Sequence, residues 1–179
     1  RGLSRPHHPI SDFERISDHA KSIQISARRL RDKGQAFSKD AQAELEVLFR
    51  AVRQVTRLTA DSFIANDPQL ATKVEPLEQV VDHLCATMKA RHIVRLQEGA
   101  CSVEQGMLFT DLLTDCSRIS DHCSNVAAAI IELGRDSYDT HHYLDHVREH
   151  GDSFKQPYQA YLKHFSLPCA GTLSGGGAG

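Results

Sequence analysis

Two pairs of carboxylates in this sequence have the spacing that places both members on one face of a helix. Glu14 and Asp18 are four residues apart, and Glu78 and Asp82 repeat that spacing with Glu75 close by. Like charges at that distance repel each other unless a cation or a proton compensates them. A hard, oxygen-preferring cation such as magnesium or manganese fits these groups, and iron or zinc becomes suitable if a histidine joins them. Solvated helix faces carry the same pairs without a ligand, so the spacing leaves both interpretations open.

A third polar group lies between residues 111 and 125. On a helix its side chains fall within a sector about 120° wide, beside an apolar stripe. The members are Asp111, Asp115, Arg118, Asp121, His122 and Asn125. The segment therefore predicts a helix with an organised polar edge.

Part of this group has a second copy near the start of the chain. An offset of 103 residues places Asp12-Phe-Glu-Arg-Ile-Ser-Asp-His19 over Asp115-Cys-Ser-Arg-Ile-Ser-Asp-His122, and six of these eight positions are identical. A solvated face has no reason to be repeated so strictly. The offset has about the length of three helices with their connections, which predicts a three-helix module whose last helix carries the motif.

The motif also allows a structural role for its arginines. Arg15 and Arg118 each have acidic neighbours three residues away on both sides, namely Asp12, Asp18, Asp115 and Asp121. These arginines can form buried clamps between helices, and removal of Arg118 would then cost about 3 to 5 kcal/mol. His19 and His122 are expected to satisfy buried hydrogen bonds rather than bind metal. A clamp and a metal site do not exclude each other.

Composition excludes several classes of protein. The 179 residues hold 21 Lys and Arg against 23 Asp and Glu, so they lack the cationic excess that non-specific nucleic-acid binding requires. The longest uncharged apolar stretch, about Val126 to Ile131, is far shorter than the roughly 20 residues that span a bilayer. Five cysteines without a CxxC spacing predict reduced thiols in a cytosolic protein. Because the first residue is Arg1 rather than Met, we expect a chain cut from a longer one.

Apolar periodicity predicts four long helices and no strand. They are expected from about Phe13 to Gly34, from Ser38 to about Asn66, from Pro68 to about Leu96, and from a capping box at Ser102 to Gly134. Pro76 should kink the third helix or move its start. Two shorter helices are expected at about 141–149 and 154–165, separated by Gly151. The pattern predicts an all-α, antiparallel helical bundle.

The repeat predicts how this bundle is divided. Within a domain at 1–167, residues 10–34 form the last helix of a truncated first module and residues 38–134 form a second three-helix module. Residues 141–167 form C-terminal helices, and residues 168–179, rich in Gly, Ser and Ala, form a flexible tail.

The repeated motif is the point at which the sequence resembles a known family. The string E-R-I-S-D-H at 14–19 is similar to the signature of PhoU proteins. The block from Val74 to Glu132 resembles the PhoU-like domain at the cytosolic C-terminus of sodium/phosphate cotransporters. The resemblance extends over roughly Ile10 to Leu167. It implies paired three-helix bundles that restrain phosphate uptake and signalling, several of which hold metal clusters on E(D)xxxD motifs.

The resemblance also implies a set of metal ligands. Carried over to this chain they are Glu14, Asp18, Glu78, Asp82 and Asp121. Where the family motif has Glu one residue before Arg, the second copy has Ser117. A site on that helix would therefore depend on Asp121 with help from Asp115 or water.

The resemblance implies a regulatory and interaction domain rather than an enzyme. Its partner would be the membrane-embedded portion of a sodium-dependent phosphate transporter, at the cytosolic face of the cell membrane. We expect a homodimer, no nucleic acid and no direct membrane insertion. A free-standing PhoU-type regulator is the alternative, and a carboxylate-bridged metalloenzyme a weaker one, because the core helices contain no Glu-x-x-His.

Overall fold

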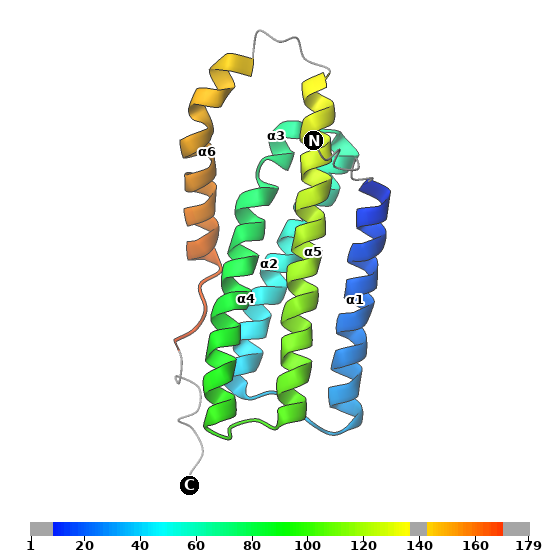
Figure 1. The fold of residues 1–179 in the computed structure, drawn as a ribbon, viewed down its shortest axis with the longest axis vertical. Coiled ribbons are helices and arrows are strands. Elements are labelled where there is room, and N and C mark those ends of the chain that lie inside the picture. Colours follow the sequence, from blue (N-terminus) through cyan, green and yellow to red (C-terminus); the bar gives the residue numbers. More distant parts are fainter. Residues whose placement is uncertain (1–8, 137–142, 170–179) are drawn as a thin grey trace, which may run out of the picture.

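The computed structural model describes residues 9–136 and 143–169, and within them the regular secondary structure is entirely helical. The helices are α1 (Pro9–Asp32), α2 (Lys39–Ala65), α3 (Pro68–Ala71), α4 (Val74–Gln97), α5 (Val103–Asp136) and α6 (Tyr143–His164). Successive long helices run in opposite directions (Figure 1). The predicted all-α antiparallel bundle is confirmed. From residue 170 on, the predicted tail lies outside the described residues.

Three helices, α2, α4 and α5, pack against one another and form the core. Their apolar stripes meet in a continuous cluster that includes Leu48, Val55, Leu77, Leu84, Met88, Phe109, Cys116, Cys123 and Val126. Helix α1 packs along α5 on one side of this bundle, and α6 packs along α4 on the other side (Figure 1). Helix α5 is therefore shared between the core and α1.

The helix ends follow the capping residues that the sequence contains. Ser38 accepts a hydrogen bond from the Ala41 N–H at the start of α2, at 3.3 Å. Before α5, Ser102 and Gln105 form the expected reciprocal capping box, with bonds of 3.1 and 2.9 Å. Gly99 follows α4 with φ +68°, a backbone conformation that favours glycine.

The predicted third helix is divided in two. Asp67 caps the single turn of α3 at Pro68, and α4 begins only at Val74. Pro76 then lies in the first turn of α4. Backbone N–H groups in that turn have no intrahelical acceptor, so a proline there costs no helical hydrogen bond. Of the two expected effects of Pro76, the structure shows the displaced start.

Two predicted helix ends are wrong. Helix α5 continues past Gly134 to Asp136, and a Cβ at Gly134 would collide with the ring of Pro68. Gly134 therefore permits a close approach between α5 and α3 instead of ending the helix. The two short helices expected after it are one helix, α6, which continues through Gly151 and Pro157.

The segment after α6 is fastened to the bundle by one aromatic ring and one arginine. The Phe165 side chain is 1% exposed in the core, and Arg91 donates a hydrogen bond of 2.7 Å to the Pro168 carbonyl. Arg91 and Arg95 both donate to the Glu44 carboxylate, at 3.0 and 2.9 Å. This buried network connects α2, α4 and the chain after α6.

Candidate functional site

Three carboxylates converge on the seam between α4 and α5. Glu78 and Asp82 come from successive turns of α4, and Asp121 comes from α5. One oxygen of each lies within 4.8 Å of the others. Asp82 is exposed and the other two are half-buried, so the cluster opens to solvent at the surface. The structure thus brings together three of the five predicted ligands.

Burial and mutual repulsion both favour a protonated acid in this cluster. Burial raises the pKa of Glu78 from 4.5 to about 8, helped by the negative charges of Asp82, Glu75 and Asp121 and by a hydrogen bond to Asp82. Glu78 therefore holds a proton at neutral pH in the absence of a cation. A bound cation would replace that proton as the compensating charge.

Two serines on α5 support the acidic side chains of α4. Ser117 donates a hydrogen bond of 2.9 Å to Asp82, and the Ser124 hydroxyl contacts the Glu75 carboxylate. Ser117 occupies the motif position where a glutamate was expected, so a hydroxyl that orients Asp82 replaces a ligand there. The expectation that Asp115 assists Asp121 is wrong, because Asp115 faces α1 instead.

The donor atoms of the cluster are oxygens. No histidine belongs to it among the described residues, so the arrangement fits a hard cation better than zinc. Burial and the charges of Asp82 and Asp121 raise the pKa of the Cys85 thiol to about 12. Cys85 remains protonated and packs as a small apolar group.

The other two predicted ligands lie elsewhere. Glu14 and Asp18 are exposed on α1, and Asp18 forms a surface ion pair of 3.3 Å with Lys21. Helix α1 packs on α5 and does not contact α4. Glu14 and Asp18 therefore do not share one metal site with the other three predicted ligands, because α5 separates α1 from α4.

The repeated motif joins α1 to α5 by two reciprocal hydrogen bonds. His122 Nδ1 lies 2.8 Å from Asp12 Oδ1, and His19 Nδ1 lies 2.8 Å from Asp115 Oδ1. The two imidazole rings are stacked, with centroids 5.9 Å apart. Asn125 donates a further bond of 3.2 Å to Asp12. The two copies of the motif are thus related by a local two-fold axis. The histidines make the predicted hydrogen bonds, which are partly buried.

The motif arginines do not form the predicted buried clamps. Arg118 is 61% exposed and pairs with Asp121 along the same helix at 3.3 Å, and Arg15 is also exposed. The histidines are shorter and lie on the α1–α5 interface, so they make the interhelical contacts instead. A cost of about 3 to 5 kcal/mol for loss of Arg118 no longer applies, because exposed pairs contribute at most about 1 kcal/mol.

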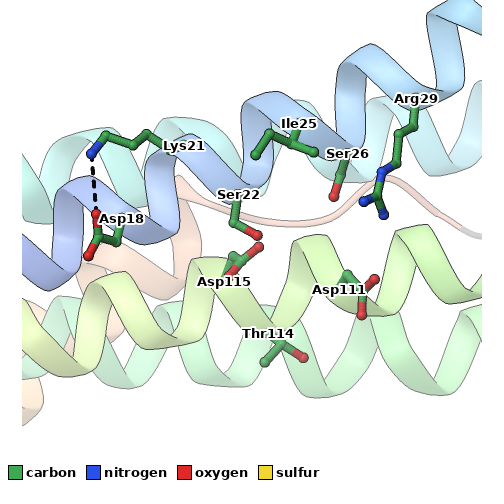
Figure 2. A pocket seen from close by; sticks show the side chains of 9 residues that line it. All are labelled: Asp18, Lys21, Ser22, Ile25, Ser26, Arg29, Asp111, Thr114 and Asp115. Atoms are coloured by element: carbon green, nitrogen blue, oxygen red, sulfur yellow. Dashed lines mark hydrogen bonds and ion pairs between the residues drawn. The ribbon is translucent and has the colours of Figure 1, made fainter.

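An open groove of about 370 Å³ lies between α1 and α5, next to the His19–Asp115 pair (Figure 2). It is lined by Asp18, Lys21, Ser22, Ile25, Ser26, Arg29, Asp111, Thr114 and Asp115. Figure 2 shows the side chains of Ser22 and Asp115 turned toward each other. Aspartates on both walls offset the positive charges of Lys21 and Arg29 on α1. The groove therefore favours neither a simple anion nor a simple cation.

The Glu44–Arg91–Arg95 network was not anticipated from the sequence. Its signal was nevertheless present, since Glu44 interrupts the apolar stripe of α2 and the two arginines are four residues apart on α4. An acidic residue on a buried stripe requires a cationic partner. The network holds helices together and offers no free carboxylate for chemistry.

Comparison with known proteins finds a domain family that matches the core of the bundle. The PhoU domain family matches residues 45–130, which contain α3, α4 and most of α2 and α5. A phosphate-specific transport system accessory protein PhoU homolog 1 from Thermotoga maritima is 24% identical over 123 residues, which are 69% of this chain and 52% of the relative. The corresponding PhoU homolog of Pseudomonas aeruginosa is 25% identical over 140 residues, or 78% of this chain and 57% of the relative.

This chain spans about half the length of those two curated relatives. Both are named as accessory proteins, and neither name refers to a sodium/phosphate cotransporter. No solved structure matches the chain significantly. Among the described helices, none combines the length and the hydropathy that crossing a bilayer requires.

Proposed function

We propose that this chain, in which residues 45–130 form a PhoU domain, is a regulatory module of phosphate transport. The observation that carries the proposal is the PhoU domain together with two relatives whose names describe accessory proteins of phosphate-specific transport. The free-standing type of regulator, which the sequence left as the alternative, agrees better with these relatives than a cotransporter domain does.

The module acts by binding rather than by catalysis. Its acidic cluster on α4 and α5 contains three acidic side chains, and Ser117 of α5 donates a hydrogen bond to Asp82 of α4. Such an arrangement supplies a docking surface and a cation site. It offers no nucleophile paired with a base, which bond-breaking chemistry would use.

The proposed cation site consists of Glu78, Asp82 and Asp121. Magnesium, manganese or iron would supply positive charge and connect α4 to α5, while Ser117 keeps Asp82 oriented through its hydrogen bond. Glu14 and Asp18, on the far side of α5, would take part only in a separate site on the outer face of α1. The cation is a structural element of the regulator in this proposal.

A cotransporter domain is the second candidate, and the block from Val74 to Glu132 favours it by its resemblance to such domains. In that case the regulated partner is the membrane portion of the same polypeptide, at the cytosolic face. In the first case the partner is a separate phosphate transporter. We propose a homodimer for either, with the exposed side of α1 as the contact.

The proposal is tested by phosphate uptake. In Pseudomonas aeruginosa lacking its own PhoU homolog, the complete gene that encodes this chain should return phosphate uptake toward the parental rate. Uptake that stays at the level of the deletion strain would contradict an accessory role. Sodium-dependent uptake that appears in a strain without other phosphate transporters would support the cotransporter candidate instead.

The proposed homodimer is tested separately by measuring the mass of the protein in solution. Sedimentation equilibrium should give twice the monomer mass at micromolar concentrations, and Ile25→Glu on the outer face of α1, a position 52% exposed, should give the monomer mass. A monomer at every concentration of the parent protein would contradict the dimer.

A further inference from the structure

Four large apolar side chains are exposed together at the end of the α4–α5 seam. Ile93 and Leu96 near the end of α4 are 49% and 37% exposed, and Val103 and Met107 at the start of α5 are 76% and 66% exposed. Solvent-exposed apolar side chains in isolation need no explanation, but four on two adjoining helix ends form a patch of the kind that binds other proteins.

The apolar patch lies on the same face of the α4–α5 pair as the acidic cluster. At about 100° per residue, Ile93 and Leu96 fall on the side of α4 that carries Glu75, Glu78 and Asp82. The same count places Val103 and Met107 on the side of α5 that carries Asp121. A Cβ on Gly106 would lie 3.0 Å from Leu96 Cδ2, so the two helix ends are in close contact. The patch and the cluster thus occupy two ends of one surface.

The distance between the two ends follows from the helix rise. Asp82 and Ile93 are separated by 11 residues, and Asp121 and Met107 by 14. At 1.5 Å per residue these separations are roughly 17 and 21 Å. Lys89 lies between them on α4 and is exposed. Arg118, which is 61% exposed and pairs with Asp121, adds a second cation at the acidic end. The surface is therefore acidic at one end, apolar at the other, and carries two cations.

The neighbouring helices leave this face open. Helix α1 contacts α5 mainly through the side that carries Asp115 and His122, more than a quarter turn away from Asp121, and Asn125, which donates to Asp12, lies at the edge of that contact. The segment after α6 is bound by Arg91, which lies almost opposite Ile93 on α4. Helix α2 packs on the core side of both helices.

We propose that this face binds an amphipathic helix of a partner protein, with basic residues over Glu75, Glu78, Asp82 and Asp121 and apolar residues over Ile93, Leu96, Val103 and Met107. The charge pattern selects this partner, because the cluster of acidic side chains at one end attracts a cationic segment, which also favours loss of the Glu78 proton, while the other end buries apolar side chains. A straight seam between two antiparallel helices accommodates a helix along its length. The inference adds a partner chemistry to the proposed regulatory function and rests on it.

The same geometry links docking to the cation. A metal ion bound by Glu78, Asp82 and Asp121 neutralises part of the acidic end, so it competes with the basic residues of the partner. The apolar end is unaffected. Docking is therefore strongest in the cation-free protein.

A synthetic helical peptide of about 24 residues, long enough to cover the face, tests the surface. One half is rich in lysine and the other half carries leucine at helical spacing. A second peptide has the same composition in scrambled order. Fluorescence anisotropy with the full chain should show about tenfold tighter binding of the segregated peptide. Equal binding of the two peptides would overturn the proposal.

Variants locate the binding face. Ile93→Ser with Met107→Ser, and separately Glu78→Gln with Asp82→Asn, should each weaken binding about tenfold. The matched control is Ile64→Ser with Asp61→Asn on α2, where both side chains are exposed and removed from this face. It should change binding less than twofold. Similar losses in all three variants would contradict the assigned face.

Two further results separate this inference from the proposed function. If the Ile93 and Met107 variant converts a dimer to a monomer, a second copy occupies the face and the partner-helix proposal fails. If the peptide binds as expected while the gene does not affect phosphate uptake, the surface stands and the proposed function fails. If the gene regulates phosphate uptake but the face variants leave that regulation unchanged, the proposed function stands and the docking surface fails.

Discussion

Helix α5 has acidic residues on two of its sides, and their charges are compensated in different ways. Toward α1, Asp115 pairs with His19, and α5 in turn supplies His122 and Asn125 to Asp12. Toward α4, Asp121 meets Glu78 and Asp82. Burial and the neighbouring negative charges raise the pKa of Glu78 so that it retains a proton, and Arg118 pairs with Asp121 only at the surface. The first interface is complete within the chain, whereas the second requires a proton, a cation or a partner.

The difference shows what each interface is suited to do. Reciprocal Asp–His pairs hold two helices in one register, since a shift along the axis breaks both bonds at once. Carboxylates that repel one another destabilise the bundle slightly, and binding of a positive charge restores that stability. Rigidity and ligand response thus lie on adjacent faces of one helix, only one residue apart at Asp121 and His122.

The largest expected effect concerns the complete interface. Asp12→Ala removes a buried carboxylate and leaves His122 and Asn125 without their partner, so the free energy of unfolding should fall by about 3 kcal/mol. Urea denaturation measures it. Asp61→Ala, at an exposed position on α2, is the control and should change stability by less than about 0.5 kcal/mol. Equal effects of the two variants would show that the Asp–His pairs do not hold α1.

The second prediction concerns the incomplete interface. Manganese, iron or magnesium should raise the free energy of unfolding, by about 2.7 kcal/mol when the free ion is a hundred times its dissociation constant. Asp82→Asn with Asp121→Asn should abolish this shift. Glu14→Gln with Asp18→Asn removes two carboxylates from α1 and should preserve it. Thermal melts with and without a chelator decide, and an unresponsive parent protein would leave the cluster as a surface for protein partners alone.

A smaller, pH-dependent effect is expected at Glu78. Its pKa is about 8 in the folded protein against 4.5 for the ordinary side chain, so between these values the unfolded state has lost a proton that the folded state keeps. Stability therefore falls as pH rises through this window. Glu78→Gln should be nearly neutral below pH 4.5 and stabilising above pH 8.

The control for this effect is Glu14→Gln, which alters an exposed carboxylate of α1. Chemical denaturation in metal-free buffer at a series of pH values gives both curves. A difference between Glu78→Gln and the parent that does not grow with pH would contradict the raised pKa.

The smallest effect is expected at Arg118, the residue that the motif first suggested as a clamp. Because its ion pair with Asp121 is exposed, Arg118→Ala should change stability by less than about 1 kcal/mol, and salt should reduce the difference further. A loss comparable to that of Asp12→Ala would restore the clamp interpretation. Denaturation at low and high ionic strength provides the measurement.

Local patterns in the sequence account for most of the secondary structure. Ser38, Ser102 with Gln105, and Gly99 mark helix ends because capping depends on residues within one turn. Gly134 and Gly151 were wrongly predicted as helix ends, because a glycine within a helix can also be required by contacts that are distant in sequence. The role of Gly134 depends on Pro68, which is 66 residues away in sequence and close only in the folded chain.

The candidate site was predictable only in part. The spacing of Glu78 and Asp82 placed both on one face of α4, and the repeat identified Asp121, but neither pattern indicates which helix lies against which face. The same limit explains the misplacement of Glu14 and Asp18. Their spacing equals that of Glu78 and Asp82, although α1 packs along α5 rather than α4.

By itself, the sequence determined the helices, their caps, the repeated motif and its family resemblance, because each of these is written in residues that are near in sequence or identical between copies. Only the tertiary structure decided that Asp115 turns to α1 while Asp121 turns to α4, and that histidines rather than arginines join the two copies. The physical reason is that a helix carries residues on all sides with the same periodicity. Which side becomes an interface depends on how well the apolar stripes of separate helices pack together, and that is a property of the whole bundle.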